Sequence, residues 1–129
     1  VIDREGKKTA IDIEEGTTIR DAIEEKLSPD NYGVCGGNCV CGTCQVHVTP
    51  SDFEKLKAVE EDEISTLKEE AIKPTTHSRL GCQIELKKEH NNITVTIAPD
   101  YYYSFLLGYR DIFIFYILPP LLIHQLHCL

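Results

Sequence analysis

The alternation of apolar and polar residues predicts several short strands in the first hundred residues. Residues 9–13 and 93–97 alternate side chains of the two kinds, which is the pattern of a strand with one buried face. Shorter candidates lie at residues 1–3, 45–48 and 84–86. Because a polar turn around Gly6 separates residues 1–3 from residues 9–13, we expect these two strands to form a β-hairpin.

Other stretches follow the period of an α-helix. Apolar residues recur at helical spacing from Ile19 to Leu27, and Thr18 followed by Asp21 resembles a capping box at the start of that helix. A shorter helix is expected at residues 51–56. Strands, one main helix and short helices in this order predict an α+β protein with a β-grasp fold, in which one main helix covers a mixed sheet.

The third predicted helix, within residues 60–71, is strongly acidic. Its apolar stripe consists of Ile64, Leu67 and Ala71, which we expect to dock on the domain. Its polar side consists of Asp62, Thr66 and Glu69, with Glu63 and Glu70 along one flank. Such a face is either a solvated helix surface or a docking surface for a basic protein. For the second interpretation the candidate contacts are Asp62, Glu63, Glu69 and Glu70.

The distribution of charge favours a docking surface. The chain has 21 acidic and 13 basic residues, and only Asp111 and Arg110 lie beyond residue 100, so the whole net charge of −8 lies before it. An acidic domain repels nucleic acid and attracts basic protein surfaces. We therefore expect a protein partner and no nucleic acid.

The least regular stretch, residues 35–44, contains four cysteines and three glycines. Thiolates on a Gly-rich loop are soft ligands that select zinc, copper(I) or iron–sulfur clusters, and they indicate a reducing compartment rather than disulfides. The informative spacing is Cys35-x5-Cys41-x2-Cys44, with Cys82 far downstream. Structural zinc sites usually use two short cysteine pairs, so this division into three and one favours a [2Fe–2S] cluster. A zinc-stabilised binding module that uses the same thiolates is the alternative.

Around these cysteines the chain resembles the adrenodoxin/putidaredoxin-type [2Fe–2S] ferredoxins. The resemblance rests on Cys-Gly-Gly-x-x-x-Cys-x-Thr-Cys at residues 35–44, Phe-Glu-Lys-Leu at residues 53–56 and Ser-Arg-Leu-Gly-Cys-Gln-Ile at residues 78–84. It extends over about residues 1–99. One departure is Gln45, since this family often has His after the third cysteine of the loop.

The motif assigns roles to the residues of the loop. We expect the metal ligands to be Cys35, Cys41, Cys44 and Cys82, which leaves Cys39 spare. Backbone N–H groups would point at the sulfurs from Gly36, Gly37, Gly42 and Thr43. We expect His47, a lone histidine in a strand, to be structural.

The expected activity is one-electron transfer rather than catalysis, because no catalytic set or phosphate-binding loop accompanies the cluster motif. The resemblance implies a flavoprotein ferredoxin reductase as electron donor. It implies a cytochrome P450, another oxygenase or the iron–sulfur assembly machinery as acceptor. The compartment would be the bacterial cytoplasm or the mitochondrial matrix.

Residues 100–129 do not continue this pattern, so we expect the ferredoxin domain to comprise residues 1–99, with an N-terminus that is truncated. The segment is apolar and aromatic, and Pro119-Pro120 interrupts it. Only 18 residues follow Asp111, which is marginal for a membrane span of about 20 residues. Three interpretations remain: a membrane anchor, which would bring membrane contact, an extra packing or partner segment, and a non-native extension.

Overall fold

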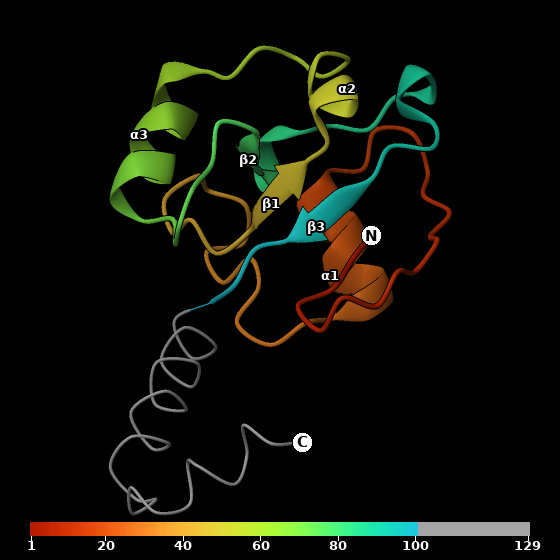
Figure 1. The fold of residues 1–129 in the computed structure, drawn as a ribbon, viewed down its shortest axis with the longest axis horizontal. Coiled ribbons are helices and arrows are strands. Elements are labelled where there is room, and N and C mark those ends of the chain that lie inside the picture. Colours follow the sequence, from red (N-terminus) through yellow and green to blue (C-terminus); the bar gives the residue numbers. More distant parts are fainter. Residues whose placement is uncertain (101–129) are drawn as a thin grey trace, which may run out of the picture. The chain divides into compact units, whose positions relative to one another are not determined.

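Three short antiparallel strands form the central sheet, in the order β2–β1–β3 (Figure 1). β1 (Gln45–Val48) lies in the middle, between β2 (Ser78–Leu80) and β3 (Val95–Ile97). The computed structural model describes residues 1–100. The central position of β1 follows from its sequence, because three of its four residues are buried and a strand with neighbours on both edges must tolerate burial.

The register of the sheet brings its most buried side chains together. Val46 lies opposite Arg79 of β2 and opposite Ile97 of β3. The accessible surface of Val46 and of Leu80 is 0%. These apolar side chains form the core together with the inner face of the first helix.

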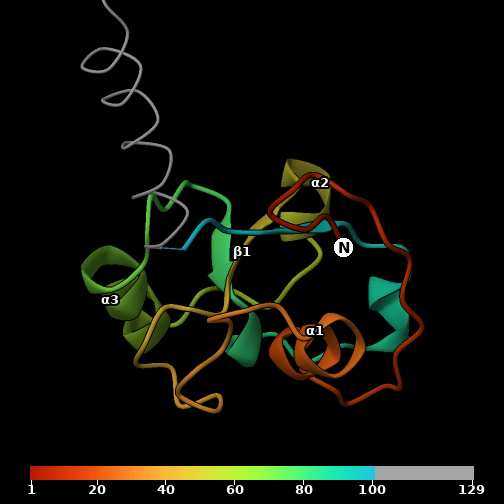
Figure 2. The ribbon, with the colours of Figure 1, turned by 90° about the horizontal axis from the view of Figure 1, so that it is seen from below.

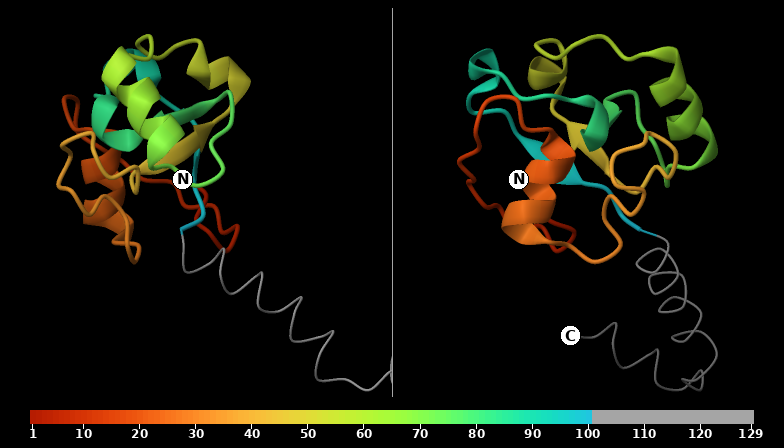
Figure 3. Two further views of the ribbon diagram at one scale, coloured as in Figure 1. Left: turned by 90° about the vertical axis from the view of Figure 1, so that its left-hand side faces the viewer. Right: turned by 180° about the vertical axis from the view of Figure 1, so that it is seen from behind.

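That helix, α1 (Ile19–Leu27), begins and ends where the sequence predicts. The Asp21 N–H donates to Oγ1 of Thr18 at 3.1 Å, and Ser28 adopts a left-handed backbone with φ 43° at the other end. Ile19, Ala22 and Ile23 are the buried side chains. Seen from behind in Figure 3, the helix lies across one face of the sheet.

The remaining helices are short. α2 (Pro50–Phe53) follows β1, and α3 (Glu61–Glu69) lies beside β2 (Figure 2). The two 3₁₀ helices are η1 (Gly81–Gln83) and η2 (Lys88–His90). α2 ends three residues earlier than predicted.

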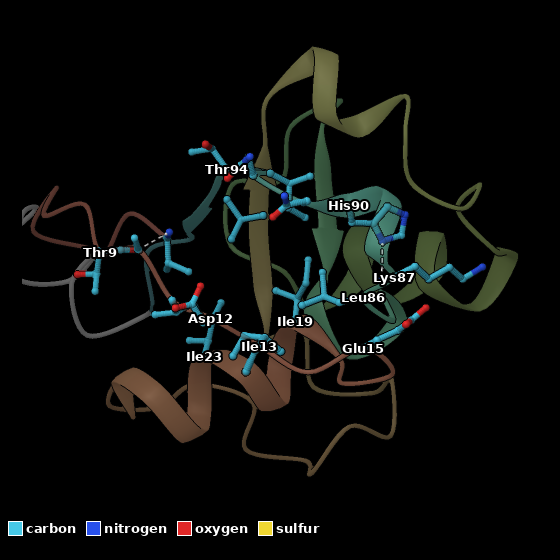
Figure 4. A pocket seen from close by; sticks show the side chains of 18 of the residues that line it. Thr9, Asp12, Ile13, Glu15, Ile19, Ile23, Leu86, Lys87, His90 and Thr94 are labelled. Carbon is cyan, nitrogen blue, oxygen red and sulfur yellow. Dashed lines mark hydrogen bonds between the residues drawn. The ribbon is translucent and has the colours of Figure 1, made fainter.

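The predicted N-terminal hairpin forms next to its turn but does not extend to residue 13. Gly6 has φ 85°, the Thr9 N–H donates to the Val1 carbonyl at 2.8 Å, and the Asp3 N–H donates to the Lys7 carbonyl at 3.0 Å. Ile2 forms one bridge antiparallel to Lys8 and one parallel to Thr96. Residues 10–13 alternate in exposure as predicted but do not form a strand. A cavity of about 1000 Å³ lies beside them (Figure 4), and no cysteine lines it. It is therefore not the metal site.

The strand predicted at residues 84–86 is also wrong. The main chain there pairs with the segment before α1: the Ile19 N–H donates to the Ile84 carbonyl at 2.9 Å, and the Leu86 N–H donates to the Thr17 carbonyl at 2.9 Å. The alternation of side chains at residues 84–86 reflects this pairing with a loop.

Asp52 ties α2 to the chain just before β3. Its carboxylate accepts hydrogen bonds from the Thr94 N–H at 3.0 Å, from Thr49 Oγ1 at 2.7 Å and from Lys55 Nζ at 2.9 Å. The Thr94 N–H, followed by the Thr49 and Lys55 side chains, lowers the pKa of Asp52 to about 2. Only 7% of the residue is exposed. The ionised form therefore stabilises the fold.

We expect Asp52→Asn to lower the free energy of unfolding by about 1–3 kcal/mol at neutral pH. Because the folded pKa lies below the unfolded value, the stabilisation is complete above about pH 4 and disappears as the pH falls through about 2. Urea unfolding at several pH values measures this difference. A difference between the two proteins that is independent of pH would contradict the assignment.

Every prediction for residues 101–129 lies outside the described residues, and the domain boundary near residue 99 stays a prediction. Within residues 1–100, none of the helices is long and apolar enough to cross a membrane.

Candidate metal centre

The cysteine loop runs from Gly33 to Cys44, between α1 and α3 (Figures 2 and 3). It packs closely on α3 through Gly42, which has φ 66°. A Cβ there would lie 3.0 Å from the backbone nitrogen of Ala71 and 3.0 Å from the carbonyl carbon of Glu70. Only glycine fits both this backbone conformation and this contact.

Four of the five described cysteines are associated in two pairs. The Cys41 thiol lies close enough to Cys35 to lower its pKa, and the Cys44 thiol does the same for Cys82. In residues 1–100 no group of three or more Cys, His, Asp or Glu side chains is arranged to hold one metal ion. Two thiolate pairs suit a centre with two irons, each of which takes two cysteines. A tetrahedral zinc site would instead need its ligands around one point.

The surroundings of the sulfurs favour the thiolate form of Cys35 and of Cys82. Burial raises the pKa of Cys35, but the Val40 N–H, the Cys41 thiol and the N–H groups of Gly37 and Asn38 lower it, to about 7. The Cys44 thiol is the main cause that lowers the pKa of Cys82 to about 6, and the same contact raises the pKa of Cys44. Metal ligation requires deprotonated sulfur, so this environment fits a metal centre.

The N–H groups near the sulfurs only partly coincide with those predicted. Gly37 is among the donors to Cys35, whereas the Gly36 N–H donates to the Gly33 carbonyl at 3.0 Å. Gly42 provides the contact with α3 instead. Thr43 contributes its side chain, whose Oγ1 lies 3.0 Å from Cys41 Sγ and accepts the Val34 N–H at 3.0 Å. The role predicted for Gly36 is therefore wrong.

Sequence reasoning missed the donors at Asn38, Cys39 and Val40. The Cys39 N–H lowers the pKa of Cys82, and the N–H groups of Asn38 and Val40 lower the pKa of Cys35. A backbone donor leaves no mark in the side-chain pattern. The only sequence feature that indicated these backbone donors was the high number of glycines, which allows the chain to fold around its own sulfurs.

Cys39 stands apart from the two pairs and faces α3. Its carbonyl accepts a hydrogen bond from Thr66 Oγ1 at 2.6 Å, and its backbone has φ 59°. Burial is the main cause that raises the pKa of its thiol. His47 is likewise occupied in the fold, with its Nδ1 3.0 Å from Ser78 Oγ.

The helical register predicted for α3 is wrong at Glu63. The side chain is 1% exposed and forms an ion pair with Arg79, which is also 1% exposed. Glu63 Oε1 accepts from Arg79 Nε at 2.8 Å and from the Leu80 N–H at 2.8 Å, while Oε2 accepts from Arg79 Nη2 at 3.1 Å. Glu63 is therefore a structural residue and cannot contact a partner.

The burial of Arg79 explains why α3 turns Glu63 toward the interior. The Arg79 guanidinium also donates to the Lys57 carbonyl at 2.7 Å and lies 5.7 Å from the centre of the Phe53 ring. A buried charge requires a partner, so α3 turns a carboxylate inward and leaves Ile64 39% exposed. The sequence feature that could have indicated this buried ion pair is Arg79, a charged residue next to the apolar Leu80 in a short strand.

The other three predicted docking residues, Asp62, Glu69 and Glu70, are exposed. They lie on α3 or directly after it, and Thr66 of the same helix contacts the cysteine loop. The loop itself exposes Val34 and Val40. Acidic and apolar side chains thus lie on neighbouring parts of the surface around the cysteines.

Comparison with known proteins agrees with this site. Residues 2–87 match the family described as 2Fe-2S iron-sulfur cluster binding domain. A mitochondrial adrenodoxin of Gallus gallus is 38% identical over 97 residues, which cover 74% of this chain and 67% of the relative. A mitochondrial adrenodoxin homolog of Saccharomyces cerevisiae is 38% identical over 94 residues, which cover 73% and 54%. The chain thus spans about half to two thirds of the length of these relatives.

Solved structures agree in fold. A reduced putidaredoxin variant from Pseudomonas putida superposes with a TM-score of 0.71 at 31% identity, covering 77% of this chain and 92% of the other. Putidaredoxin in a covalent complex with putidaredoxin reductase gives a TM-score of 0.70 at 30% identity, covering 74% and 92%.

The chain therefore belongs to the family of [2Fe–2S] iron–sulfur cluster binding domains. Within it, the chain is of the adrenodoxin/putidaredoxin type, and the predicted β-grasp ferredoxin fold is confirmed. Proteins of this type carry one [2Fe–2S] cluster and transfer electrons rather than catalyse a reaction.

Proposed function

We propose that Cys35 and Cys41 hold one iron of the cluster, and that Cys44 and Cys82 hold the other. The observation that carries this assignment is the association of the four thiols in two pairs. When bound, the cluster accepts and releases one electron at a time. The zinc module is the competing function, and an anaerobic visible and EPR spectrum of the purified protein separates the two, since a zinc protein is colourless.

The loop residues would stabilise the charge that arrives with the electron. N–H groups of Gly37, Asn38 and Val40 are directed at Cys35, and that of Cys39 is directed at Cys82. Hydrogen bonds to sulfur favour the more negative state of an iron–sulfur centre.

The partner that we propose as electron donor is a flavoprotein ferredoxin reductase with a basic surface. The covalent complex of putidaredoxin with its reductase supports this choice of partner. On this chain the docking surface would comprise Asp62 and Glu69 of α3 and Glu70, which directly follows it, together with Val40 of the loop. Val40 is 62% exposed, and two contacts join its loop to α3: Thr66 to the Cys39 carbonyl, and Gly42 to Glu70. Opposite charge would steer the encounter, while the apolar loop would be buried in the complex.

Reversing two exposed charges of α3 tests this surface. We expect Asp62→Lys with Glu69→Lys to slow electron transfer from the reductase about 10-fold or more at low salt, with little loss of stability. The rate for the native protein should fall as ionic strength rises, whereas the rate for the variant should respond weakly. Stopped-flow reduction over a range of salt concentrations measures both rates.

The matched control is Glu14→Lys with Glu15→Lys, which changes the net charge equally on exposed residues of the N-terminal segment. This control should retain most of the native rate. Equal slowing in both double variants would mean that only net charge matters, and that α3 is a solvated surface.

For the acceptor we propose a cytochrome P450, another oxygenase or an iron–sulfur assembly protein. The related adrenodoxins are mitochondrial, and putidaredoxin comes from a bacterium. We accordingly propose a reducing compartment, either the mitochondrial matrix or the bacterial cytoplasm.

A further inference from the structure

Arg20, the second residue of α1, extends its side chain along the cysteine loop. Its Nη2 donates to the Gly33 carbonyl at 3.1 Å, two residues before Cys35. A Cβ added to Gly33 would lie 2.6 Å from Arg20 Nε, so the arginine occupies the space that a side chain at position 33 would need. The guanidinium is thus held against the start of the loop.

The backbone of Arg20 packs on the segments that carry two of the ligands. A Cβ on Gly81 would lie 3.0 Å from the Arg20 nitrogen and 3.1 Å from the Cys44 carbonyl oxygen. The Gly81 N–H donates to that same carbonyl at 2.9 Å. The start of α1 therefore adjoins both Cys44 and Cys82, and the Arg20 charge interacts electrostatically with Cys44.

This positive charge is only partly neutralised. The Arg20 side chain is 18% exposed, and its buried Nε has no hydrogen-bond partner among residues 1–100. Nη1 donates to Asp21 Oδ1 at 2.6 Å, and the Asp21 side chain is 52% exposed, so water weakens this ion pair and the carboxylate neutralises only part of the Arg20 charge. A partly desolvated cation beside the start of the cysteine loop, which interacts with Cys44, favours additional negative charge there.

We propose that Arg20 sets the reduction potential of the cluster by stabilising its reduced state. Reduction of the bound cluster by its electron donor would add one electron and one negative charge without loss of a ligand, and the Arg20 guanidinium would attract that charge. This inference rests on the proposed ligation by Cys44 and its partners. A failure of that ligation would appear as missing [2Fe–2S] absorbance. A failure of the present inference would appear as an unchanged potential in a protein with full absorbance.

Spectroelectrochemical titration of Arg20→Gln, Arg20→Lys and Asp21→Asn tests the proposal without any partner protein. At a fixed ambient potential, we expect Arg20→Gln to lower the ratio of reduced to oxidised protein about three- to tenfold, which is a fall of up to about 59 mV for one electron. Arg20→Lys keeps the charge and should restore most of the ratio. Asp21→Asn removes the screening carboxylate and should raise the ratio.

The matched control is Lys26→Gln, which removes a positive charge from the exposed last turn of the same helix. Its potential should remain that of the native protein. Equal shifts in Arg20→Gln and Lys26→Gln would overturn the proposal. Should Arg20→Gln fail to fold, an unchanged potential in Asp21→Asn would overturn it as well.

Discussion

Replacing Cys41 by Ser should remove or visibly alter the [2Fe–2S] absorption, whereas Cys39→Ser should leave it intact. The Cys41 thiol pairs with Cys35 and lies 3.0 Å from Thr43 Oγ1, inside the group of four thiols. Cys39 lies outside the two pairs, and its carbonyl accepts from Thr66. Serine oxygen is a harder ligand than sulfur, so only a substitution at an iron ligand changes the cluster. Visible absorption and bound iron per chain measure the outcome.

Cys39→Ala serves as the control for the hydroxyl that serine introduces. It should behave as Cys39→Ser does, with a small loss of stability from the removed sulfur. Bleaching in both Cys39 variants, with native absorption in Cys41→Ser, would show that the assignment of ligands within the loop is wrong.

The second large effect should come from Glu63→Gln, which we expect to destabilise the domain by about 3–5 kcal/mol. The substitution keeps the shape of the side chain but leaves the Arg79 charge, 1% exposed, without its carboxylate. The loss should also loosen the backbone at Leu80, because the Leu80 N–H donates to the same carboxylate. Urea unfolding of the cluster-loaded protein, followed by circular dichroism, measures the change.

Asp62→Asn is the matched control, because it removes the same charge from the neighbouring, exposed position of α3. Its stability should stay within about 0.5 kcal/mol of the native value. If the two variants unfolded at the same urea concentration, the buried ion pair would not contribute to stability. Replacing both Glu63 and Arg79 by Met should recover part of the loss, since no charge then remains buried.

The cluster and the main helix could be predicted from the sequence because their determinants are local. Four cysteines at a specific spacing identify the centre, and the Thr18 cap with the apolar face of residues 19–27 defines α1. The β-grasp fold was predicted correctly from the main helix and the family resemblance, although β2 was not predicted and residues 84–86 do not form a strand.

The features that the sequence did not predict depend on contacts between residues that are far apart in the sequence. Glu63 belongs to a charged stretch, and its burial is caused by Arg79, sixteen residues further on. Residues 84–86 alternate like a strand, but their main chain pairs with the loop before α1 instead of joining the sheet. The contact of Arg20 with Gly33 also requires the folded chain, since neither residue belongs to the cysteine motif.

Gln45 makes a hydrogen bond beside the metal centre that does not depend on pH. Its side chain is buried, and Nε2 donates to the Ile72 carbonyl at 2.9 Å, which joins the strand leaving the cysteine loop to the segment between α3 and β2. A histidine, unlike glutamine, has a neutral and a charged form, and a change between them would alter that connection. An amide does not titrate. The connection therefore keeps the same charge and the same donor on both sides of neutrality.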